Sequence, residues 1–150
     1  PHRVTGLDPD GRDWCLTQDN GARVLARAVI VATGVEYRRL PLDRLEEFEG
    51  AGIYYAATEI EARWCRDTEV VVIGGGNSAG QAAMFLSRST RHVHVLVRGK
   101  TLADSMSSYL VERLVKSLNI TIHYRTQVVG LAGEKALSSV TIHSAEDGQD

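Results

Sequence analysis

The sequence predicts an α/β fold built on a parallel β-sheet, and three observations carry this prediction. Four β-branched residues, Val70–Ile73, run directly into three glycines, as a strand buried on both faces does before a tight turn. Helical periodicity begins at Ser78. A second apolar run, Val93–Val97, completes a β-α-β unit of about thirty residues. We expect a Rossmann-like, three-layer domain with a small antiparallel β meander.

The glycine-rich stretch predicts a binding turn for a dinucleotide. Gly74 would make the tight turn, Gly76 would let the backbone approach phosphates, and the small Ala79 would let the helix pack on the strand. The helix N-terminus offers free N–H groups and a positive dipole end to an anion. The predicted binding residues of this stretch are Gly74, Gly75, Gly76, Asn77, Ser78 and Ala79.

The composition is that of a globular protein of 150 residues with a formal net charge of −2. This charge does not favour nucleic acid or an anionic membrane as a partner, and no apolar run reaches the length of a membrane span. The sequence begins at Pro1 rather than Met, which suggests a piece of a longer protein. Cys15 and Cys65 lie far apart in the sequence, so their spacing does not indicate a redox pair. We expect each to be a small buried residue in a cytoplasmic protein.

The N-terminal region predicts β-structure. The dipeptide Asn20-Gly21 stands between strand-like runs at 13–17 and 22–25, which is a strong hairpin signal. Residues 27–32 predict a further strand. The connecting region 35–69 contains a short helical turn within 42–49, and residues 58–66 are ambiguous between loop and helix.

The elements after the glycine turn alternate in type. We expect a helix over 78–89, a strand over 91–98, a helix over 102–118 and a strand over 120–124. Asp104 or Ser105 would cap the second helix, and its apolar stripe would include Leu118. Antiparallel strands over 127–132 and 136–143 would follow, with a polar loop over 144–150.

With these motifs, the chain resembles the thioredoxin reductase branch of the FAD/NAD(P)-binding pyridine nucleotide-disulfide oxidoreductases. The run Val29–Gly34 resembles the strand with which these proteins leave the FAD domain, and Val72–Ala79 is similar to their NADPH-binding turn. The resemblance implies that 1–47 ends the first FAD-domain segment and crosses over, and that 48–150 is the NAD(P)-binding domain. FAD would be held by the full-length protein, so we expect the chain alone to be inactive.

The family also implies a Cys-x-x-Cys pair shortly before the glycine turn. Counting back from Gly74 places this pair near Ala57–Ile60, and neither end is a cysteine. Disulfide exchange needs a thiolate and a resolving thiol within reach. The sequence therefore does not support reduction of thioredoxin through this pair.

The end of the second strand predicts which nicotinamide cofactor is bound. An acidic residue there would accept the ribose 2′-OH of NAD, but the chain has Arg98-Gly99-Lys100. Arg98 can offer its planar guanidinium to a phosphate, and Lys100 adds a second charge. Strongly NADPH-preferring members carry further arginines where this chain has Gly99 and Ala103. We expect NADPH rather than NADH.

Two other readings of the residues carry less weight. The histidines would lie on different strand faces, with His92 and His94 together and His123 elsewhere, and without a cluster at zinc spacing; no metal site is predicted. The letters Gly76-Asn77-Ser78-Ala79-Gly80 fit the Gly-x-Ser-x-Gly pattern of hydrolases, but no partner acid and histidine support it. No catalytic acid, base or nucleophile is predicted.

The resulting prediction is an NADPH-binding portion of an FAD-dependent oxidoreductase that passes hydride from NADPH to FAD without the disulfide. Its electron acceptor is open, and the full-length protein could form a homodimer. One alternative is an enzyme like the ferredoxin or flavodoxin reductases, which needs no cysteine pair. Another is a nucleotide-sensing module without catalysis.

Overall fold

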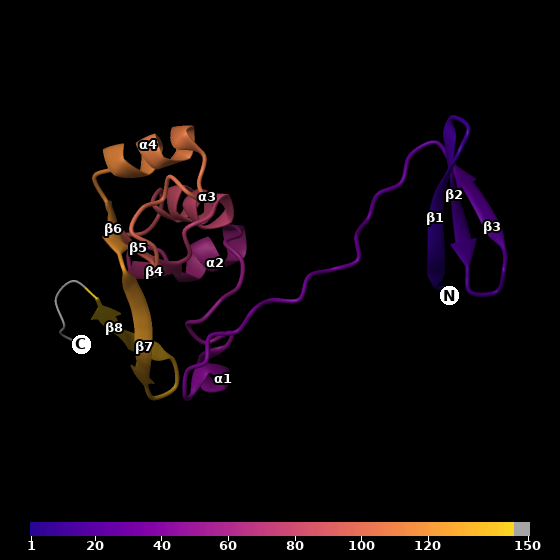
Figure 1. Ribbon diagram of the computed structural model, residues 1–150. Coiled ribbons are helices and arrows are strands. Elements are labelled where there is room, and N and C mark those ends of the chain that lie inside the picture. Colours follow the sequence, from indigo (N-terminus) through magenta and orange to yellow (C-terminus); the bar gives the residue numbers. More distant parts are fainter. Residues whose placement is uncertain (146–150) are drawn as a thin grey trace. The chain divides into compact units, whose positions relative to one another are not determined.

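The computed structural model describes residues 1–145. Contacts between residues divide the chain into two compact units, Pro1–Tyr37 and Arg38–Asp150, and each is described by itself (Figure 1). The division falls earlier than the expected domain boundary after residue 47, which stays a prediction about the family's domains. The expected loop over 144–150 lies almost wholly outside the described residues.

The first unit is a three-stranded antiparallel sheet. Its strands are β1 (Val4–Asp10), β2 (Asp13–Gln18) and β3 (Arg23–Ala26), in the order β1-β2-β3. The predicted hairpin at Asn20-Gly21 is confirmed: Gly21 has a φ of +80°, and the Asn20 side chain accepts a hydrogen bond from the Ala22 N–H at 2.9 Å. This asparagine-glycine turn fixes the register of β2 against β3.

The strand predicted over residues 27–32 is wrong for this chain. These residues adopt no regular structure, and Ile30 and Val31 are 91% and 71% exposed. A strand needs a neighbour for its backbone N–H and C=O groups, and no strand among the described residues pairs with this segment.

The second unit is organised on a parallel sheet of β4 (Glu69–Ile73), β5 (His92–Val97) and β6 (Ile120–Tyr124), in that order. Helix α3 (Asn77–Leu86) connects β4 to β5, and α4 (Ser108–Lys116) connects β5 to β6. Both β-α-β crossovers predicted from the sequence are therefore present (Figure 1), and the carboxyl ends of the three strands lie at one edge of the sheet.

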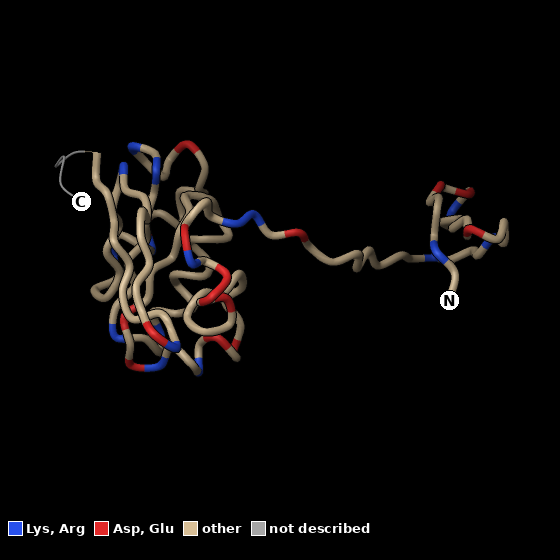
Figure 2. The backbone as a smooth tube through the Cα atoms, turned by 90° about the horizontal axis from the view of Figure 1, so that it is seen from below, with Lys and Arg blue, Asp and Glu red and all other residues tan. Residues whose placement is uncertain are grey.

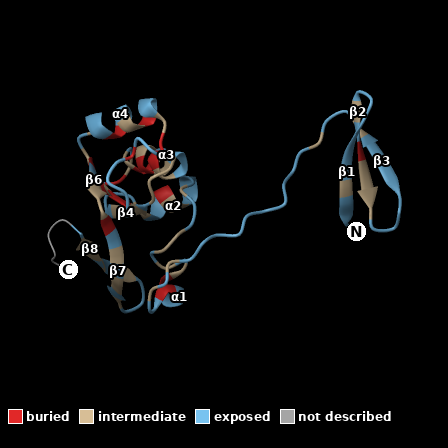
Figure 3. Cartoon of the chain, in the orientation of Figure 1, coloured by how far each residue is buried: buried red, intermediate tan, exposed pale blue. Residues whose placement is uncertain are grey.

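The main core lies between the sheet and the two helices. Val93 and Val95 of β5 are fully buried together with Ala83 of α3 and Leu110 and Leu114 of α4, and the buried residues gather there in Figure 3. Leu96 is also buried, at 2% exposure, although it points to the other face of the sheet. Strand β5 is also contacted by β7 (Thr126–Gly133), which pairs with β8 (Leu137–Ser144). Helices, parallel sheet and β meander form the three predicted layers.

Three expectations about these elements are wrong. Strand β4 is not buried on both faces, because Val71 and Ile73, which lie on the same face, are 37% and 46% exposed. The second helix does not span 102–118. Residues 102–106 form a turn, Ser107 rather than Asp104 or Ser105 is the N-cap residue, and Leu118 is fully exposed. The first helix, in turn, ends at Leu86 rather than at residue 89.

Two short helices complete the second unit. Helix α1 (Leu45–Phe48) packs on the β7–β8 hairpin, since Arg44 donates to the Gly133 carbonyl at 3.1 Å. Helix α2 (Glu59–Trp64) resolves the ambiguous stretch: Thr58 and Glu61 form a capping box.

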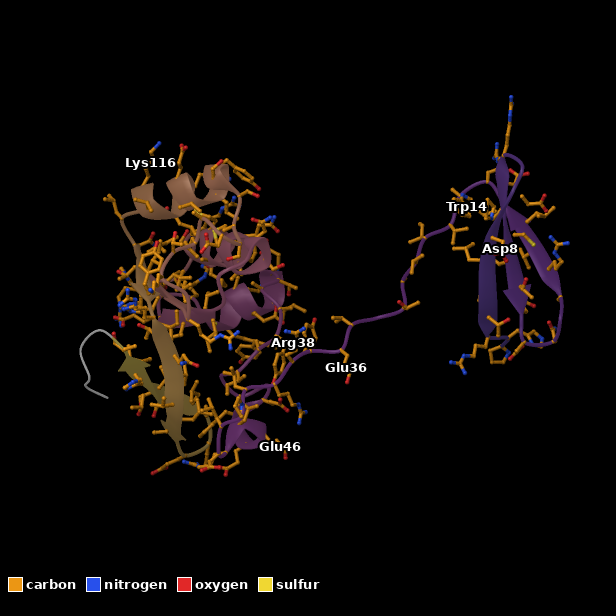
Figure 4. The ribbon with its side chains drawn as sticks, in the orientation of Figure 1. Asp8, Trp14, Glu36, Arg38, Glu46 and Lys116 are labelled. Carbon is orange, nitrogen blue, oxygen red and sulfur yellow. The ribbon has the colours of Figure 1, made fainter. Side chains whose placement is uncertain are left out.

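The charged side chains are distributed over both units. Figure 2 shows residues of both signs along each of them. Figure 4 shows Lys116 at the end of α4 and Glu46 on α1, where Glu46 accepts a hydrogen bond from Arg39 at 2.9 Å. None of the helices within residues 1–145 has the length and hydrophobicity of a membrane span.

Candidate cofactor site

The glycine turn follows β4 at the carboxyl edge of the parallel sheet. Gly74 has a φ of +143°, a conformation that residues with a Cβ rarely adopt. Its N–H donates to the Leu96 carbonyl at 3.0 Å, which ties the turn to β5. A Cβ at Gly74 would stand 3.1 Å from the Ala79 Cβ. The tight turn and the close approach of Ala79, both predicted from the sequence, are present.

The next two glycines have different surroundings. A Cβ on Gly75 would meet the Val97 side chain at 3.2 Å and the Ser105 Oγ at 3.4 Å, so this residue is packed against its neighbours. Gly76 is the N-cap residue of α3 with an extended backbone, φ −93° and ψ 176°. A Cβ there would meet only the Ser105 carbonyl oxygen at 3.9 Å. The space beside the Gly76 backbone is therefore open.

The N-terminus of α3 presents unpaired backbone donors at this open space. The first helical hydrogen bond runs from the Gly80 N–H to the Gly76 carbonyl at 3.1 Å, so the N–H groups of residues 76–79 have no partner within the helix. No side chain in the described part of the protein caps the helix, and its first turn holds no acidic residue. Asn77 and Ser78 are exposed. These donors and the helix dipole favour an anion such as a pyrophosphate.

A loop that the sequence analysis assigned to the second helix holds this turn in place. The Ser105 hydroxyl donates to the Gly75 carbonyl at 2.8 Å, and the Ser107 N–H donates to the Asn77 Oδ1 at 2.8 Å. Met106, between these serines, is buried. Each bond joins residues thirty positions apart, so no local sequence signal could have indicated them.

Gly80 is a second residue that the sequence analysis missed. It is buried in α3, and a Cβ there would lie 2.7 Å from the Leu110 Cδ2 and 2.8 Å from the Met106 Sδ. The absence of a side chain lets α3 and the chain around α4 approach closely. The spacing Gly76-x-x-x-Gly80 is visible in the sequence, but the packing partners of Gly80 come from α4 and from the turn before it.

Arg98 and Lys100 lie beyond the carboxyl end of β5, beside the strand that leads into the glycine turn. The register pairs Ile73 of β4 with Leu96 of β5. Arg98 and Lys100 are both exposed, and within the described part of the chain no acidic side chain forms an ion pair with either of them. The two cations are therefore available to a ligand at the same edge of the sheet.

The histidines are arranged differently from the expectation. Strand register brings His94 and His123 to the same face, where His94 Nδ1 lies 3.0 Å from His123 Nε2. The His92 and His94 rings are 4.7 Å apart, and Glu69 lies 3.5 Å from His94 Nε2. Burial and the neighbouring imidazoles lower the pKa of His123. Within residues 1–145, no group of histidine, cysteine or carboxylate side chains has the geometry of a metal site.

The surroundings of Ser78 and of the two cysteines argue against a hydrolase nucleophile and against a redox pair. Ser78 lies inside the first turn of α3 and does not adopt the left-handed backbone of a nucleophile elbow. Cys15 is buried in the first unit, and Cys65 is a half-buried free thiol at the end of α2. Burial raises the pKa of Cys65, which disfavours the reactive thiolate. The place expected for Cys-x-x-Cys is occupied by the start of α2.

Comparisons with known proteins agree with this geometry. Residues 2–150 match the family described as "Pyridine nucleotide-disulphide oxidoreductase". The thioredoxin reductase of Mycoplasma genitalium is 36% identical over 134 residues, which are 89% of this chain and 42% of that protein. The ferredoxin–NADP reductase of Rhodospirillum rubrum is 37% identical over 144 residues, 93% of this chain and 41% of that protein.

A solved structure gives the same result for the fold. The thioredoxin reductase of Lactococcus lactis superposes with a TM-score of 0.72 at 25% identity, covering 99% of this chain and 48% of that one. The chain thus spans less than half the length of these relatives. With its glycine turn, its parallel sheet and this family match, the chain belongs to the thioredoxin reductase-like branch of the pyridine nucleotide-disulphide oxidoreductases.

Proposed function

We propose that the second unit is the NADPH-binding part of an FAD-dependent oxidoreductase. The observation that carries the proposal is the N-terminus of α3. Open space lies there after a glycine turn, next to four N–H groups that have no partner within the helix and, in residues 1–145, no side-chain cap. The expected ligand residues of this turn are Gly74, Gly75, Gly76, Asn77, Ser78 and Ala79. Family membership supports a dinucleotide as the anion.

The backbone would bind the pyrophosphate. Gly76 leaves room for a phosphate, and the N–H groups of Asn77, Ser78 and Ala79 would donate to its oxygens. The exposed Ser78 hydroxyl adds a donor at the same helix end. These groups would orient the cofactor and carry no charge of their own.

Arg98 and Lys100 would select NADPH over NADH. No carboxylate stands directly at the end of β5 to accept a ribose 2′-OH, and a guanidinium pairs well with a 2′-phosphate. The exposure of both cations, unpaired within residues 1–145, supports this role. The Arg125 N–H donates to the Gly99 carbonyl at 3.1 Å, which anchors the turn between the two cations.

When bound, the nicotinamide would supply hydride to an FAD held by parts of the full-length protein outside this chain. The residues of this chain bind and orient the cofactor, and we assign none of them a catalytic role. We also propose that the protein lacks the family's redox pair before the glycine turn, since its two thiols lie in different units. A reductase whose flavin passes electrons to a ferredoxin or flavodoxin is a second candidate, favoured by the Rhodospirillum rubrum relative.

The proposal is tested by titrating the protein and its Arg98→Ala variant with NADPH and with NADH. We expect Arg98→Ala to weaken NADPH by about tenfold or more, as loss of a charge-assisted pair does, and to leave NADH nearly unchanged. Equal losses for the two cofactors would refute the assignment of Arg98. In the full-length protein, bleaching of the flavin absorbance by NADPH would exclude a sensing module, and its absence would favour one.

A further inference from the structure

We propose that Ser105 is a positioning residue of the nicotinamide site, which it serves by holding the Gly75–Gly76 peptide in one orientation. This inference rests on the proposed function, because it explains how the glycine turn keeps its donors directed at an anion. It concerns a residue of the loop after β5 that does not itself need to touch the cofactor.

The peptide plane between Gly75 and Gly76 is the part of the turn whose orientation the backbone constrains least. Rotation of a peptide plane changes the ψ angle of the residue before it and the φ angle of the residue after it. Both flanking residues are glycines, which populate both halves of φ space. The backbone alone therefore does not decide which way this peptide faces.

The orientation of this peptide decides whether the turn attracts or repels an anion. The peptide bond between Gly75 and Gly76 is trans, so the Gly75 carbonyl and the Gly76 N–H point in opposite directions. Within the described residues, the Gly76 N–H donates to no protein acceptor. In the observed orientation it adds a donor to those of α3, whereas a flipped peptide would present the carbonyl oxygen to the phosphate instead.

Ser105 is the group that fixes the orientation. Its hydroxyl donates to the Gly75 carbonyl at 2.8 Å, which holds the carbonyl toward the loop and turns the Gly76 N–H away from it. The loop itself is anchored on both sides of Ser105. Leu102 and Met106 are buried, at 0% and 5% exposure, and the Ser107 N–H bonds to the Asn77 Oδ1 at 2.8 Å.

Neighbouring serines supply matched controls. Ser107 contributes only its backbone N–H to Asn77, so Ser107→Ala keeps that bond. Ser105→Ala removes the hydroxyl that reaches Gly75, and Ser105→Thr retains a hydroxyl. Since Ser105 is exposed, its substitution does not open a cavity in the core.

The experiment compares wild type, Ser105→Ala, Ser105→Thr and Ser107→Ala by calorimetric titration with NADPH, NADH and adenosine 2′-monophosphate. We expect Ser105→Ala to weaken the binding of NADPH and of NADH alike, by about tenfold. The reason is that the Gly76 N–H would no longer be held as a donor to the charged pyrophosphate. Adenosine 2′-monophosphate has no pyrophosphate, so its affinity should not change. Ser105→Thr should recover most of the loss, and Ser107→Ala should match wild type.

A second readout follows the peptide itself. In ¹⁵N-labelled protein, saturating NADPH should shift the Gly76 amide resonance in wild type, and this shift should shrink in Ser105→Ala. Unchanged NADPH affinity in Ser105→Ala, or an equal loss for adenosine 2′-monophosphate, would overturn the role of Ser105. Failure of the wild type to bind either nicotinamide nucleotide would instead overturn the proposed function.

Discussion

Substitution of alanine at Gly74 and at Gly76 should separate the fold of the glycine turn from its function. At Gly74, alanine would have to adopt a φ of +143°, and such conformations cost of order 1–3 kcal/mol. Its Cβ would also stand 3.1 Å from the Ala79 Cβ, which is fixed to a helix and cannot rotate away. With about 1 kcal/mol for this crowding, and about 0.5 kcal/mol regained from the less flexible unfolded chain, we expect a loss of about 1.5–3.5 kcal/mol.

Gly76→Ala is the matched control for stability. The backbone of Gly76 is extended, and its Cβ would meet only the Ser105 carbonyl oxygen at 3.9 Å. Alanine is a poorer N-cap residue than glycine, whereas the unfolded chain loses entropy, so the stability should stay within about 1 kcal/mol of wild type. The new methyl group would occupy the space proposed for a phosphate, and NADPH affinity should fall by about tenfold or more.

The assay is urea unfolding, monitored through the fluorescence of one tryptophan. The chain has two tryptophans, and Trp14 belongs to the first unit, so both variants are made in a Trp14→Phe background. Trp64 then reports the second unit, where α2 joins the main core through Ala62. Stability of Gly74→Ala within about 0.5 kcal/mol of the background protein, or a large loss in Gly76→Ala, would refute this reasoning.

Three further predictions concern the site, the core and the histidines. Asn77→Asp should keep the acceptor for the Ser107 N–H but weaken NADPH by about tenfold or more, because it adds a negative charge beside the pyrophosphate; unchanged affinity in a calorimetric titration would contradict this. Leu114→Ala should lower the free energy of unfolding by about 2–5 kcal/mol, since Leu114 is fully buried. Leu118→Ala should change it by less than about 0.5 kcal/mol. Similar losses for the two variants in urea unfolding would contradict the end of α4 before Leu118. Burial and the charges of His94 and His92 lower the pKa of His123 in the native state, so the unfolded chain binds more protons just below pH 6.5, and stability should fall as the pH falls through that window. His123→Gln should flatten this dependence, and an unchanged slope in urea unfolding at a series of pH values would count against it.

The sequence was most informative where residues act through their neighbours in the chain. The apolar run before Gly74 and the apolar run over 93–97 predicted β4 and β5 almost to the residue. The glycine turn was predicted because its requirements are local: a positive φ at Gly74 and a small residue at Ala79. Such features need no knowledge of the rest of the fold.

The sequence was misleading where burial depends on distant elements. Leu102 and Met106 are spaced as on one helix face and are both buried, but they belong to a turn that passes over the glycine loop rather than to α4. The apolar run over 27–32 indicates burial in a sheet, although no described strand pairs with it. His94 and His123 meet only through the register of β5 and β6, and Ser105 reaches Gly75 across thirty residues.

Calorimetric titration of the protein with NADPH tests the central claim most directly. We predict saturable binding at one site per chain, with NADH bound more weakly because it lacks the phosphate that Arg98 and Lys100 would hold. Gly76→Ala should weaken this binding while the protein stays folded. Absence of binding by both NADPH and NADH to the folded protein would contradict the assignment of the glycine turn as a nicotinamide nucleotide site.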